Sequence, residues 1–215
     1  MIKALIFDLD GTLANTEELH FKAWQETLLT NGVASFPFEA FLQYVGTSNE
    51  KVARDYIDSD AIPKSVVQLI KEKQDRYMEL IPQVQLFKGA KETIDEFHTV
   101  KMLAVASSSH EKEVRAILNH HGLLDKMSAV FCGDMVTNKK PDPEIYLKTS
   151  NAINIPPAEC VAFEDSSHGV NAAKSAGMKA IAIPNSFTTE HDFNRADRVL
   201  KSFLEVNQQL IADLE

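Results

Sequence analysis

The sequence has few of the features that mark a disulfide-stabilised or zinc-binding protein. Its 215 residues include two cysteines, Cys132 and Cys160, in no CxxC pair and without histidines at zinc-finger spacing. Each cysteine lies in a short apolar run, which is typical of a buried, unreactive thiol. The chain therefore fits a reduced compartment better than a secretory one.

Long apolar stretches and an excess of basic residues are also missing. No apolar run is long enough to span a bilayer, and the first run begins at Ala4, which leaves no room for a signal peptide. Lysine and arginine number 22 against 31 aspartates and glutamates, a formal net charge of −9. This balance argues against nucleic acid and membranes as partners. We expect a cytoplasmic protein, with a monomer as the default.

Nucleotide-binding loops are absent as well. Neither GxxxxGK[ST] nor GxGxxG occurs, which counts against a nucleotide-fuelled enzyme. The composition is that of an ordinary globular protein, with 44% hydrophobic and 25% charged residues. A chain of this size can form a large core with an inserted subdomain.

Short apolar runs alternate with segments of helical period through most of the chain. The runs, rich in β-branched and small residues, occupy residues 4–7, 102–106, 129–132, 161–163 and 180–183. The helical patterns at 111–121 and 167–176 are each followed by a glycine at the position of a helix C-cap. This alternation predicts an α/β fold, a doubly wound parallel sheet with helices on both faces.

Residues 15–86 interrupt the alternation. They contain helix-like segments at 17–30, 49–57 and 65–81 and no convincing strand. We therefore predict an α/β core of residues 1–14 and 87–215, with a helical subdomain of residues 15–86 inserted after the first strand.

Reactive side chains gather where the apolar runs end. Asp8 and Asp10 follow the first run, Ser107 the second, Lys140 comes beyond the third, and Glu164 and Asp165 follow the fourth. Ligands of open α/β sheets bind at the carboxyl ends of the strands, so these groups are expected to meet at one edge. A serine in such a place also has a structural interpretation, because Ser108 and Glu111 have the spacing of a helix capping box.

The DLDGT segment at residues 8–12 has the spacing of a paired-carboxylate site. Residues two apart in an extended segment point to the same side, and Gly11 permits a sharp exit from the strand. Two such carboxylates should divide their roles, one ionised as nucleophile or metal ligand, the other protonated as general acid. Glu164 and Asp165 add oxygen ligands of the kind that Mg²⁺ prefers. With a serine and a lysine for the phosphoryl oxygens, the set predicts phosphoryl transfer through an aspartyl phosphate.

These residues carry a resemblance to a known family. FDLDGT at residues 7–12, Ser107, KPDP from Lys140 and EDS from Glu164, in that order, resemble the four motifs of the haloacid dehalogenase superfamily. The helical insertion resembles the small α-helical cap of that superfamily. TEELH at residues 16–20 with Trp24 is similar to the start of the cap in the β-phosphoglucomutase-like branch. The resemblance extends over essentially the whole chain.

The resemblance implies roles for the motif residues. Asp8 would be the nucleophile, and Asp10 the acid and base that protonates the leaving oxygen and then activates water. Mg²⁺ would be held by Asp8, the Asp10 carbonyl oxygen, Glu164 and Asp165. The presence of Asp10 argues against an actual dehalogenase, in which the corresponding residue is not the acid and base.

The resemblance also implies a phosphate site. Ser107 and Lys140 would bind the phosphate, with Gly11 and Ser108 beside them, and Lys140 would restrain Asp8. Its neighbour Lys139 is expected to be a solvated surface charge.

Departures in the cap bear on the substrate. Relatives of β-phosphoglucomutase carry a lysine just before, and an arginine three residues after, the cap glycine that is Gly46 here. These positions are Val45 and Asn49, so a second phosphate would lose the cations expected to hold it. Lys73 is similar in position to another cap lysine, although a lysine in a charged mid-helix segment is more often solvated.

Three further residues are candidates for contact with the substrate from the cap, namely Thr16, His20 and Trp24. His20 and Trp24 lie four residues apart on one predicted helical face. They would either shield the site from water or belong to the core of the cap.

The sequence thus predicts a Mg²⁺-dependent phosphatase acting on a small phosphorylated metabolite, foremost a sugar phosphate. A β-phosphoglucomutase-type mutase is the alternative; it must hold a bisphosphate intermediate at two phosphate sites, which the missing cap cations disfavour. A receiver-type signalling module is more remote, because such domains are shorter and lack a helical insertion after the first strand.

Overall fold

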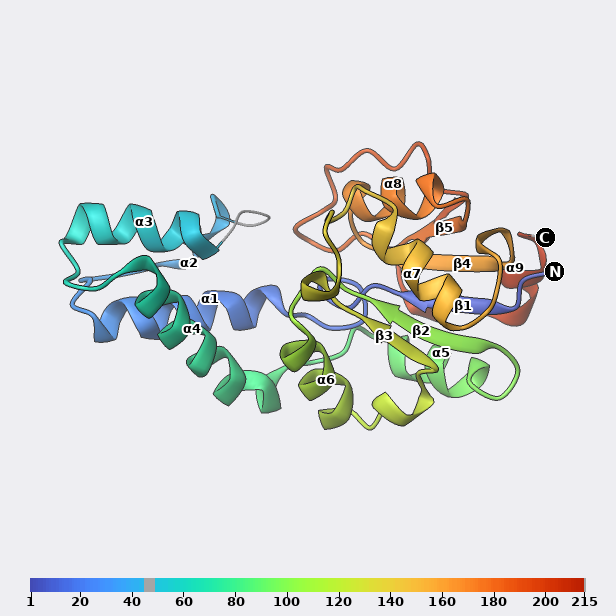
Figure 1. Cartoon of the computed structure of the whole chain (residues 1–215), viewed down its shortest axis with the longest axis horizontal. Coiled ribbons are helices and arrows are strands. Elements are labelled where there is room, and N and C mark those ends of the chain that lie inside the picture. Colours follow the sequence, from blue (N-terminus) through green and yellow to red (C-terminus); the bar gives the residue numbers. More distant parts are fainter. Residues whose placement is uncertain (45–48, 215) are drawn as a thin grey trace. The chain divides into compact units, whose positions relative to one another are not determined.

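The computed structural model describes residues 1–44 and 49–214 and divides the chain into two compact units. One unit comprises residues 1–15 and 85–215, and the other residues 16–84; Figure 1 traces both along the sequence. The second unit begins one residue later and ends two residues earlier than the insertion predicted at 15–86. Gly46 and Val45 lie outside the described residues.

The first unit is built on a six-stranded parallel sheet. Its strands are β1 (Ala4–Phe7), β2 (Met102–Ala106), β3 (Ala129–Phe131), β4 (Cys160–Glu164), β5 (Lys179–Ala182) and β6 (Arg198–Val199). They lie in the order β3-β2-β1-β4-β5-β6, which confirms the predicted α/β fold. The chain order reverses between β1 and β4, and open α/β sheets bind ligands at such a switch point.

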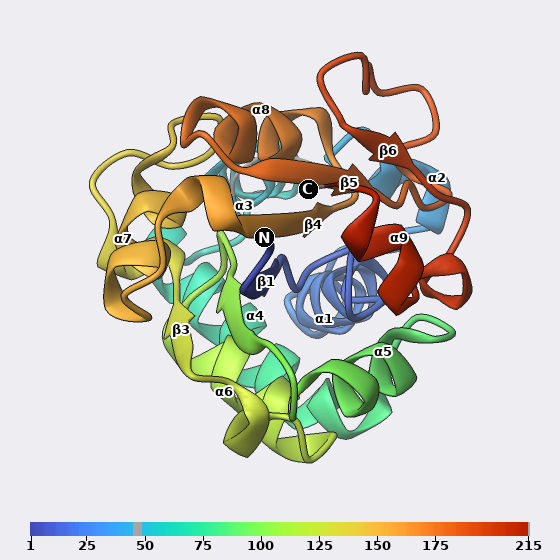
Figure 2. The ribbon, with the colours of Figure 1, turned by 90° about the vertical axis from the view of Figure 1, so that its right-hand side faces the viewer.

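The helices of this unit cover the sheet on both faces. They are α5 (Ala90–Phe97), α6 (Glu111–His120), α7 (Glu144–Ala152), α8 (Ser167–Ser175) and α9 (Gln208–Ala212). Figure 2 shows α7 and α8 on one side of the sheet and α5 and α9 on the other. The strand β6 was not predicted, because two exposed residues produce no apolar run.

Small side chains line the face of the sheet that packs against α7 and α8. Apart from Ile6, the buried strand residues on this face are alanines and one cysteine, namely Ala4, Ala104, Ala106, Cys160, Ala162, Ala180 and Ala182. Because these side chains are short, the helices pack close to the strands. The thiols Cys132 and Cys160 are buried and unpaired, and burial raises the pKa of each to about 12, so both stay protonated as expected.

Large aromatic side chains line the opposite face. Phe7 of β1 stacks on Phe163 of β4, with ring centroids 5.0 Å apart. Phe203, in the 3₁₀ turn η5 (Phe203–Glu205), lies 6.2 Å from Phe7 and 5.7 Å from Phe163. All three rings are at most 1% exposed, so this cluster anchors the C-terminal segment to the two central strands.

The second unit is helical. It contains α1 (Glu17–Thr30), α2 (Phe38–Leu42), α3 (Asn49–Asp60) and α4 (Val66–Leu80), close to the three predicted helical segments. A capping box between Ser65 and Gln68 begins α4. The core of this unit is a cluster of aromatic and aliphatic side chains, including Trp24, Phe36 and Leu69.

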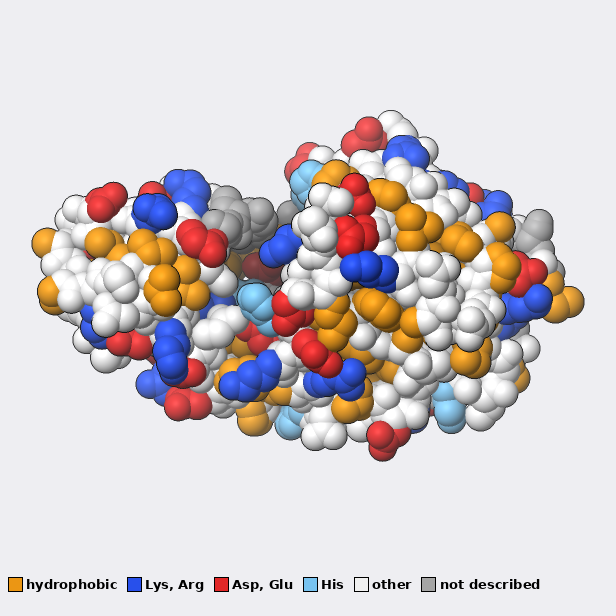
Figure 3. All heavy atoms as spheres, viewed as in Figure 1, with side chains coloured by type: hydrophobic (Ala, Val, Ile, Leu, Met, Phe, Trp, Pro, Cys, Tyr) orange, Lys and Arg blue, Asp and Glu red, His pale blue; other side chains and the backbone are white. Residues whose placement is uncertain are grey.

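Surface charges of opposite sign are paired on several exposed helices. Lys51 contacts Asp55 at 2.8 Å, and Arg115 contacts Glu111 at 2.6 Å. Figure 3 shows basic and acidic side chains interspersed on the face in view. Such exposed pairs add little stability. In residues 1–44 and 49–214, no helix has the length and apolar content needed to cross a bilayer.

The aromatic cluster makes a prediction about stability. Replacing Phe203 by alanine should lower the free energy of unfolding by about 3–5 kcal/mol, because a buried ring is lost and a cavity remains. Urea denaturation followed by circular dichroism measures this. The adjacent Leu204 is 59% exposed, so Leu204→Ala is a matched control that should change stability by under about 0.5 kcal/mol. Equal effects of the two substitutions would contradict the anchoring role of Phe203.

Candidate active site

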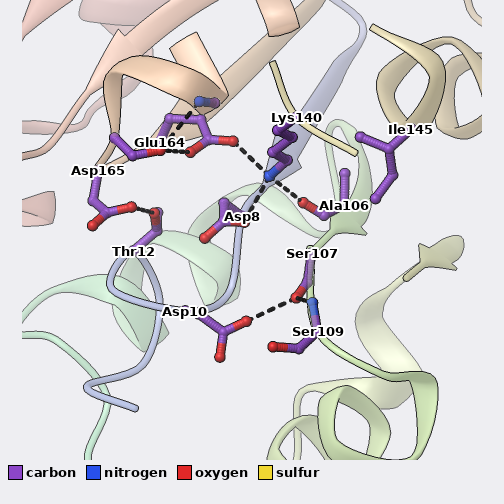
Figure 4. Close-up of polar contacts among 12 residues, drawn as sticks. Asp8, Asp10, Thr12, Ala106, Ser107, Ser109, Lys140, Ile145, Glu164 and Asp165 are labelled. Atoms are coloured by element: carbon purple, nitrogen blue, oxygen red, sulfur yellow. Dashed lines mark hydrogen bonds and ion pairs between the residues drawn. The ribbon is translucent and has the colours of Figure 1, made fainter. Parts of the chain in front are cut away.

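Three neighbouring strands bring the predicted site residues of the core to one edge of the sheet. Asp8 follows β1, Ser107 follows β2, and Glu164 and Asp165 lie at the end of β4. Lys140 reaches the same edge from the segment after β3 (Figure 4). The strand-end residues that the sequence singled out are therefore brought together.

The ammonium group of Lys140 lies at the centre of the site and contacts several of its residues. It donates hydrogen bonds to Asp8 Oδ1 at 2.7 Å, to Glu164 Oε1 at 2.6 Å and to the Ala106 carbonyl oxygen at 2.8 Å. An ammonium group has three N–H donors, and each has an acceptor here. The Lys140 side chain is 6% exposed, so its orientation is fixed by these three bonds. Lys139 is exposed, as the sequence predicts.

Glu164 is held from several sides. Its Oε1 atom accepts from Lys140 and from the Tyr146 hydroxyl at 2.5 Å, and its Oε2 atom accepts from Ser166 Oγ at 3.5 Å. Gly169 in α8 lies against the same carboxylate, because a methyl group there would be 1.9 Å from the carboxyl carbon. Glu164 is 1% exposed and is the last residue of β4, where the sequence placed it just beyond the strand.

Tyr146 is a site residue that the sequence analysis missed. Its ring lies 5.1 Å from the Lys140 Nζ atom, in cation–π geometry, and its hydroxyl bonds to Glu164. Burial and then the Glu164 charge raise its pKa well above the usual range, so the hydroxyl remains a donor. Its position in the helix after the KPDP segment was the available signal, but a core tyrosine has the same pattern.

The electrostatics of the buried groups are strongly coupled. Burial raises the pKa of Asp8; Lys140 opposes this shift, and Glu164, Asp10 and Asp165 add to it. Burial alone would lower the pKa of Lys140, but the Asp8 and Glu164 carboxylates raise it overall, so this lysine is charged. The site therefore sets three buried carboxyl groups against one ammonium group.

The same three carboxylates fit a divalent cation. Asp8, Glu164 and Asp165 each offer an oxygen atom, and these atoms lie within 4.8 Å of one another. Carboxylate oxygens are the ligands that Mg²⁺ prefers, and a divalent cation would favour the ionised form of these carboxyl groups. The donor set thus suits the magnesium that the sequence predicts.

Asp10 lies in a different environment from Asp8. Its Oδ2 atom accepts a hydrogen bond from Ser107 Oγ at 2.8 Å. Within the described part of the chain, its Oδ1 atom is buried without a hydrogen-bond donor. Asp10 is also partly exposed, whereas Asp8 is 6% exposed. The two carboxylates are therefore placed differently, as two distinct roles require.

The structure corrects one expectation about the serine segment, the capping box between Ser108 and Glu111, and it shows where Ser107 lies relative to α6. The Ser107 N–H donates to the Phe131 carbonyl oxygen at 3.0 Å, and Ser107 precedes α6 by several residues, so it is not at a helix N-terminus. Ser108 forms no capping box with Glu111. The N-cap is His110, and the Glu111 N–H donates instead to the Asp134 carboxylate from another segment. Ser108 itself is exposed.

Gly11 packs against the metal-binding candidate Asp165. Its φ is +78°, and a methyl group there would lie 2.4 Å from Asp165 Oδ2, so only glycine fits. Thr12 Oγ1 donates to Asp165 Oδ1 at 3.4 Å. Asn185, after β5, donates to Asp165 Oδ2 at 2.8 Å. Asn185 was missed because the strand-end argument was not extended to the fifth apolar run.

His20 and Lys73 in the helical unit contact each other. The His20 ring stacks on Tyr77 at 4.5 Å, and Lys73 Nζ lies 2.7 Å from His20 Nδ1. Burial and then Lys73 lower the pKa of His20 well below its usual range, so the neutral ring accepts from the ammonium. Lys73 is 0% exposed, so the interpretation as a solvated lysine is wrong.

Trp24 and Thr16, two other candidates in the helical unit, are buried. Trp24 is 1% exposed in the core of the helical unit, and its indole N–H donates to Asn49 Oδ1 at 3.2 Å. Thr16 is the N-cap of α1, but its side chain makes no capping bond. Its hydroxyl is buried and has no partner in the described residues. Gly46 cannot be placed among these residues, since it lies outside the described ranges.

Comparison with known proteins finds one matching family and several relatives of similar length. A family model described as haloacid dehalogenase-like hydrolase matches residues 5–183. Protein CbbY of Rhodobacter capsulatus is 34% identical, over 99% of this chain and 99% of its own. Fructose-1-phosphate phosphatase YqaB of Escherichia coli is 30% identical, over 83% of this chain and 95% of its own. A crystal structure of CbbY from Rhodobacter sphaeroides with xylulose-1,5-bisphosphate has a TM-score of 0.85 at 33% identity, covering 96% of this chain and 97% of that one.

The contact between Gly169 and Glu164 predicts whether Gly169→Ala raises or lowers the free energy of unfolding. Alanine is favoured over glycine in a helix by about 1 kcal/mol, so Gly169→Ala would be stabilising if the site had room. The collision with the Glu164 carboxylate should instead lower the free energy of unfolding by about 1–3 kcal/mol. Urea denaturation shows whether the Gly169→Ala protein is stabilised or destabilised. The exposed Ser175→Ala in the same helix is the control, and a stabilised Gly169→Ala protein would refute the close packing.

Proposed function

The chain belongs to the haloacid dehalogenase-like hydrolases and is a phosphoric monoester hydrolase, and on this basis we propose that it hydrolyses a small sugar phosphate through a phosphoaspartate on Asp8. One observation carries the proposal. Lys140 fixes Asp8 in a buried, charge-paired position, while Asp10 two residues later keeps one oxygen unpartnered within the described structure. The two carboxyl groups therefore differ in their surroundings, as a nucleophile and a proton donor must.

The proposed reaction has two steps. An Asp8 carboxylate oxygen attacks phosphorus, the ester P–O bond breaks, and Asp10 gives its proton to the leaving oxygen. Water then attacks phosphorus, the bond from phosphorus to Asp8 breaks, and Asp10 takes the proton from the water. Ser107 supports both steps by holding Asp10 through its hydroxyl, and Lys140 keeps Asp8 oriented.

Mg²⁺ is the proposed cofactor. Asp8, Asp165 and the Asp10 carbonyl oxygen would hold it, and its charge would offset that of the phosphoryl oxygens. Glu164 is almost fully buried and forms an ion pair with the Lys140 ammonium group, and it also accepts from Tyr146 and Ser166. This favours a role for Glu164 in holding Lys140, with its charge adding to the attraction for the cation.

The proposed substrate class follows from the relatives and from the cap. One relative is a fructose-1-phosphate phosphatase, and another was crystallised with xylulose-1,5-bisphosphate. In this chain Asn49 stands where the resemblance expects a cap arginine, and its side-chain oxygen accepts from Trp24. A neutral amide in this position favours one phosphate site over two, and so a phosphatase over a mutase.

Replacing the nucleophile provides the principal test. Asp8→Asn should lower kcat for an aryl phosphate by on the order of a thousandfold or more, because an amide cannot form the acyl phosphate. Removing divalent cations with a chelator should also abolish turnover, and adding Mg²⁺ should restore it. Asp125→Asn, an exposed position, is the matched control. Turnover that persists in Asp8→Asn or without a metal would exclude the proposed mechanism.

A second measurement separates hydrolysis from phosphoryl transfer to sugar. Incubation with β-glucose 1-phosphate, followed by phosphorus NMR, should release free phosphate, because water is the expected acceptor. Fructose 1-phosphate serves as a parallel substrate, and the Asp8→Asn protein as the blank. Accumulation of glucose 6-phosphate would identify a mutase instead.

A further inference from the structure

Asn185 connects two parts of the site that are far apart in the sequence. It lies in the loop after β5, and its Nδ2 atom donates to the Gly11 carbonyl oxygen at 2.9 Å and to Asp165 Oδ2 at 2.8 Å. One amide therefore holds both the turn that follows Asp10 and the carboxylate proposed to bind the metal.

The orientation of this amide is determined by its own surroundings. Asn185 Oδ1 accepts from the Phe187 N–H at 2.7 Å, which leaves Nδ2 to face the two acceptor oxygens. The backbone of Asn185 is fixed as well, because its N–H donates to Thr188 Oγ1 at 3.0 Å and its carbonyl accepts from the Thr188 N–H at 3.1 Å. Thr188 is buried, so the loop presents Asn185 in one conformation.

Close packing removes the remaining freedom of Asp165. A methyl group on Gly11 would lie 2.4 Å from Asp165 Oδ2 and 2.8 Å from Asn185 Nδ2, so the three residues are in direct contact. Thr12 donates to the other carboxylate oxygen, Oδ1. The Asp165 carboxylate is thus held by a donor on each oxygen.

We propose that Asn185 is a positioning residue for the metal site, which orients the Asp165 carboxylate before the cation binds. The proposal rests on the proposed function only for the identity of the cation. Partners that orient metal ligands typically change metal affinity by about 10–100-fold when they are removed. Asn185 should therefore act mainly on metal binding and less on the rate of the metal-saturated enzyme.

Manganese binding to the full chain tests this without substrate. Titration with Mn²⁺, followed by the electron paramagnetic resonance signal of the free ion, measures the Kd. Asn185→Ala and the volume-matched Asn185→Leu should raise the Kd by about 10–100-fold. Ser186→Ala, at the exposed neighbouring position, should leave it unchanged, and Asp165→Asn is the positive control for a lost ligand.

Thermal unfolding and steady-state kinetics distinguish positioning from a purely structural role. A positioning residue leaves the variants folded and raises the Mg²⁺ concentration for half-maximal rate more than it lowers kcat at saturating Mg²⁺. An unchanged Kd in either folded variant overturns the proposal, as does failure of both variants to fold. Weakened Mn²⁺ binding in the Asn185 variants, combined with a wild-type chain that binds Mn²⁺ but hydrolyses no phosphomonoester, would refute the proposed function and leave the role of Asn185 intact.

Discussion

The site depends on one buried ion pair network, in which the Lys140 ammonium is shared between Asp8 and Glu164. Burying charges is costly unless each is paired, and removal of one partner typically costs about 3–5 kcal/mol. Here the lysine joins the ends of β1 and β4 to the segment after β3. Fold and chemistry therefore share one requirement, since the same ion pairs that compensate the buried charges also orient Asp8, the proposed nucleophile.

Much of the core was predictable because parallel strands impose a simple rule. Their carboxyl ends meet at one edge, so Asp8, Ser107, Glu164 and Asp165 could be grouped before any coordinates were known. The apolar runs predicted five of the six strands, since buried strands leave a local pattern of residues. The sixth is short and exposed and leaves no such pattern.

The features that could not be predicted depend on contacts between distant segments. Lys73 has the sequence neighbours of a solvated lysine, but its ammonium lies against His20 and is buried. The first turn of α6 is capped by Asp134 and not by Ser108, because spacing along the chain does not reveal a donor or acceptor from another loop. Asn185 illustrates the same limit, since its partners lie 174 and 20 residues away.

The short side chains on the alanine-rich face of the sheet determine how closely α8 packs against the strands. Gly169 and Ser166, at the start of that helix, contact the Glu164 carboxylate, so the depth at which α8 packs determines how tightly that carboxylate is enclosed. A larger side chain at Ala162 or Ala180 would lift the helix without touching any reacting group. The volume of side chains beneath α8 is thus a means by which sequence variation can tune the site while every motif residue stays the same.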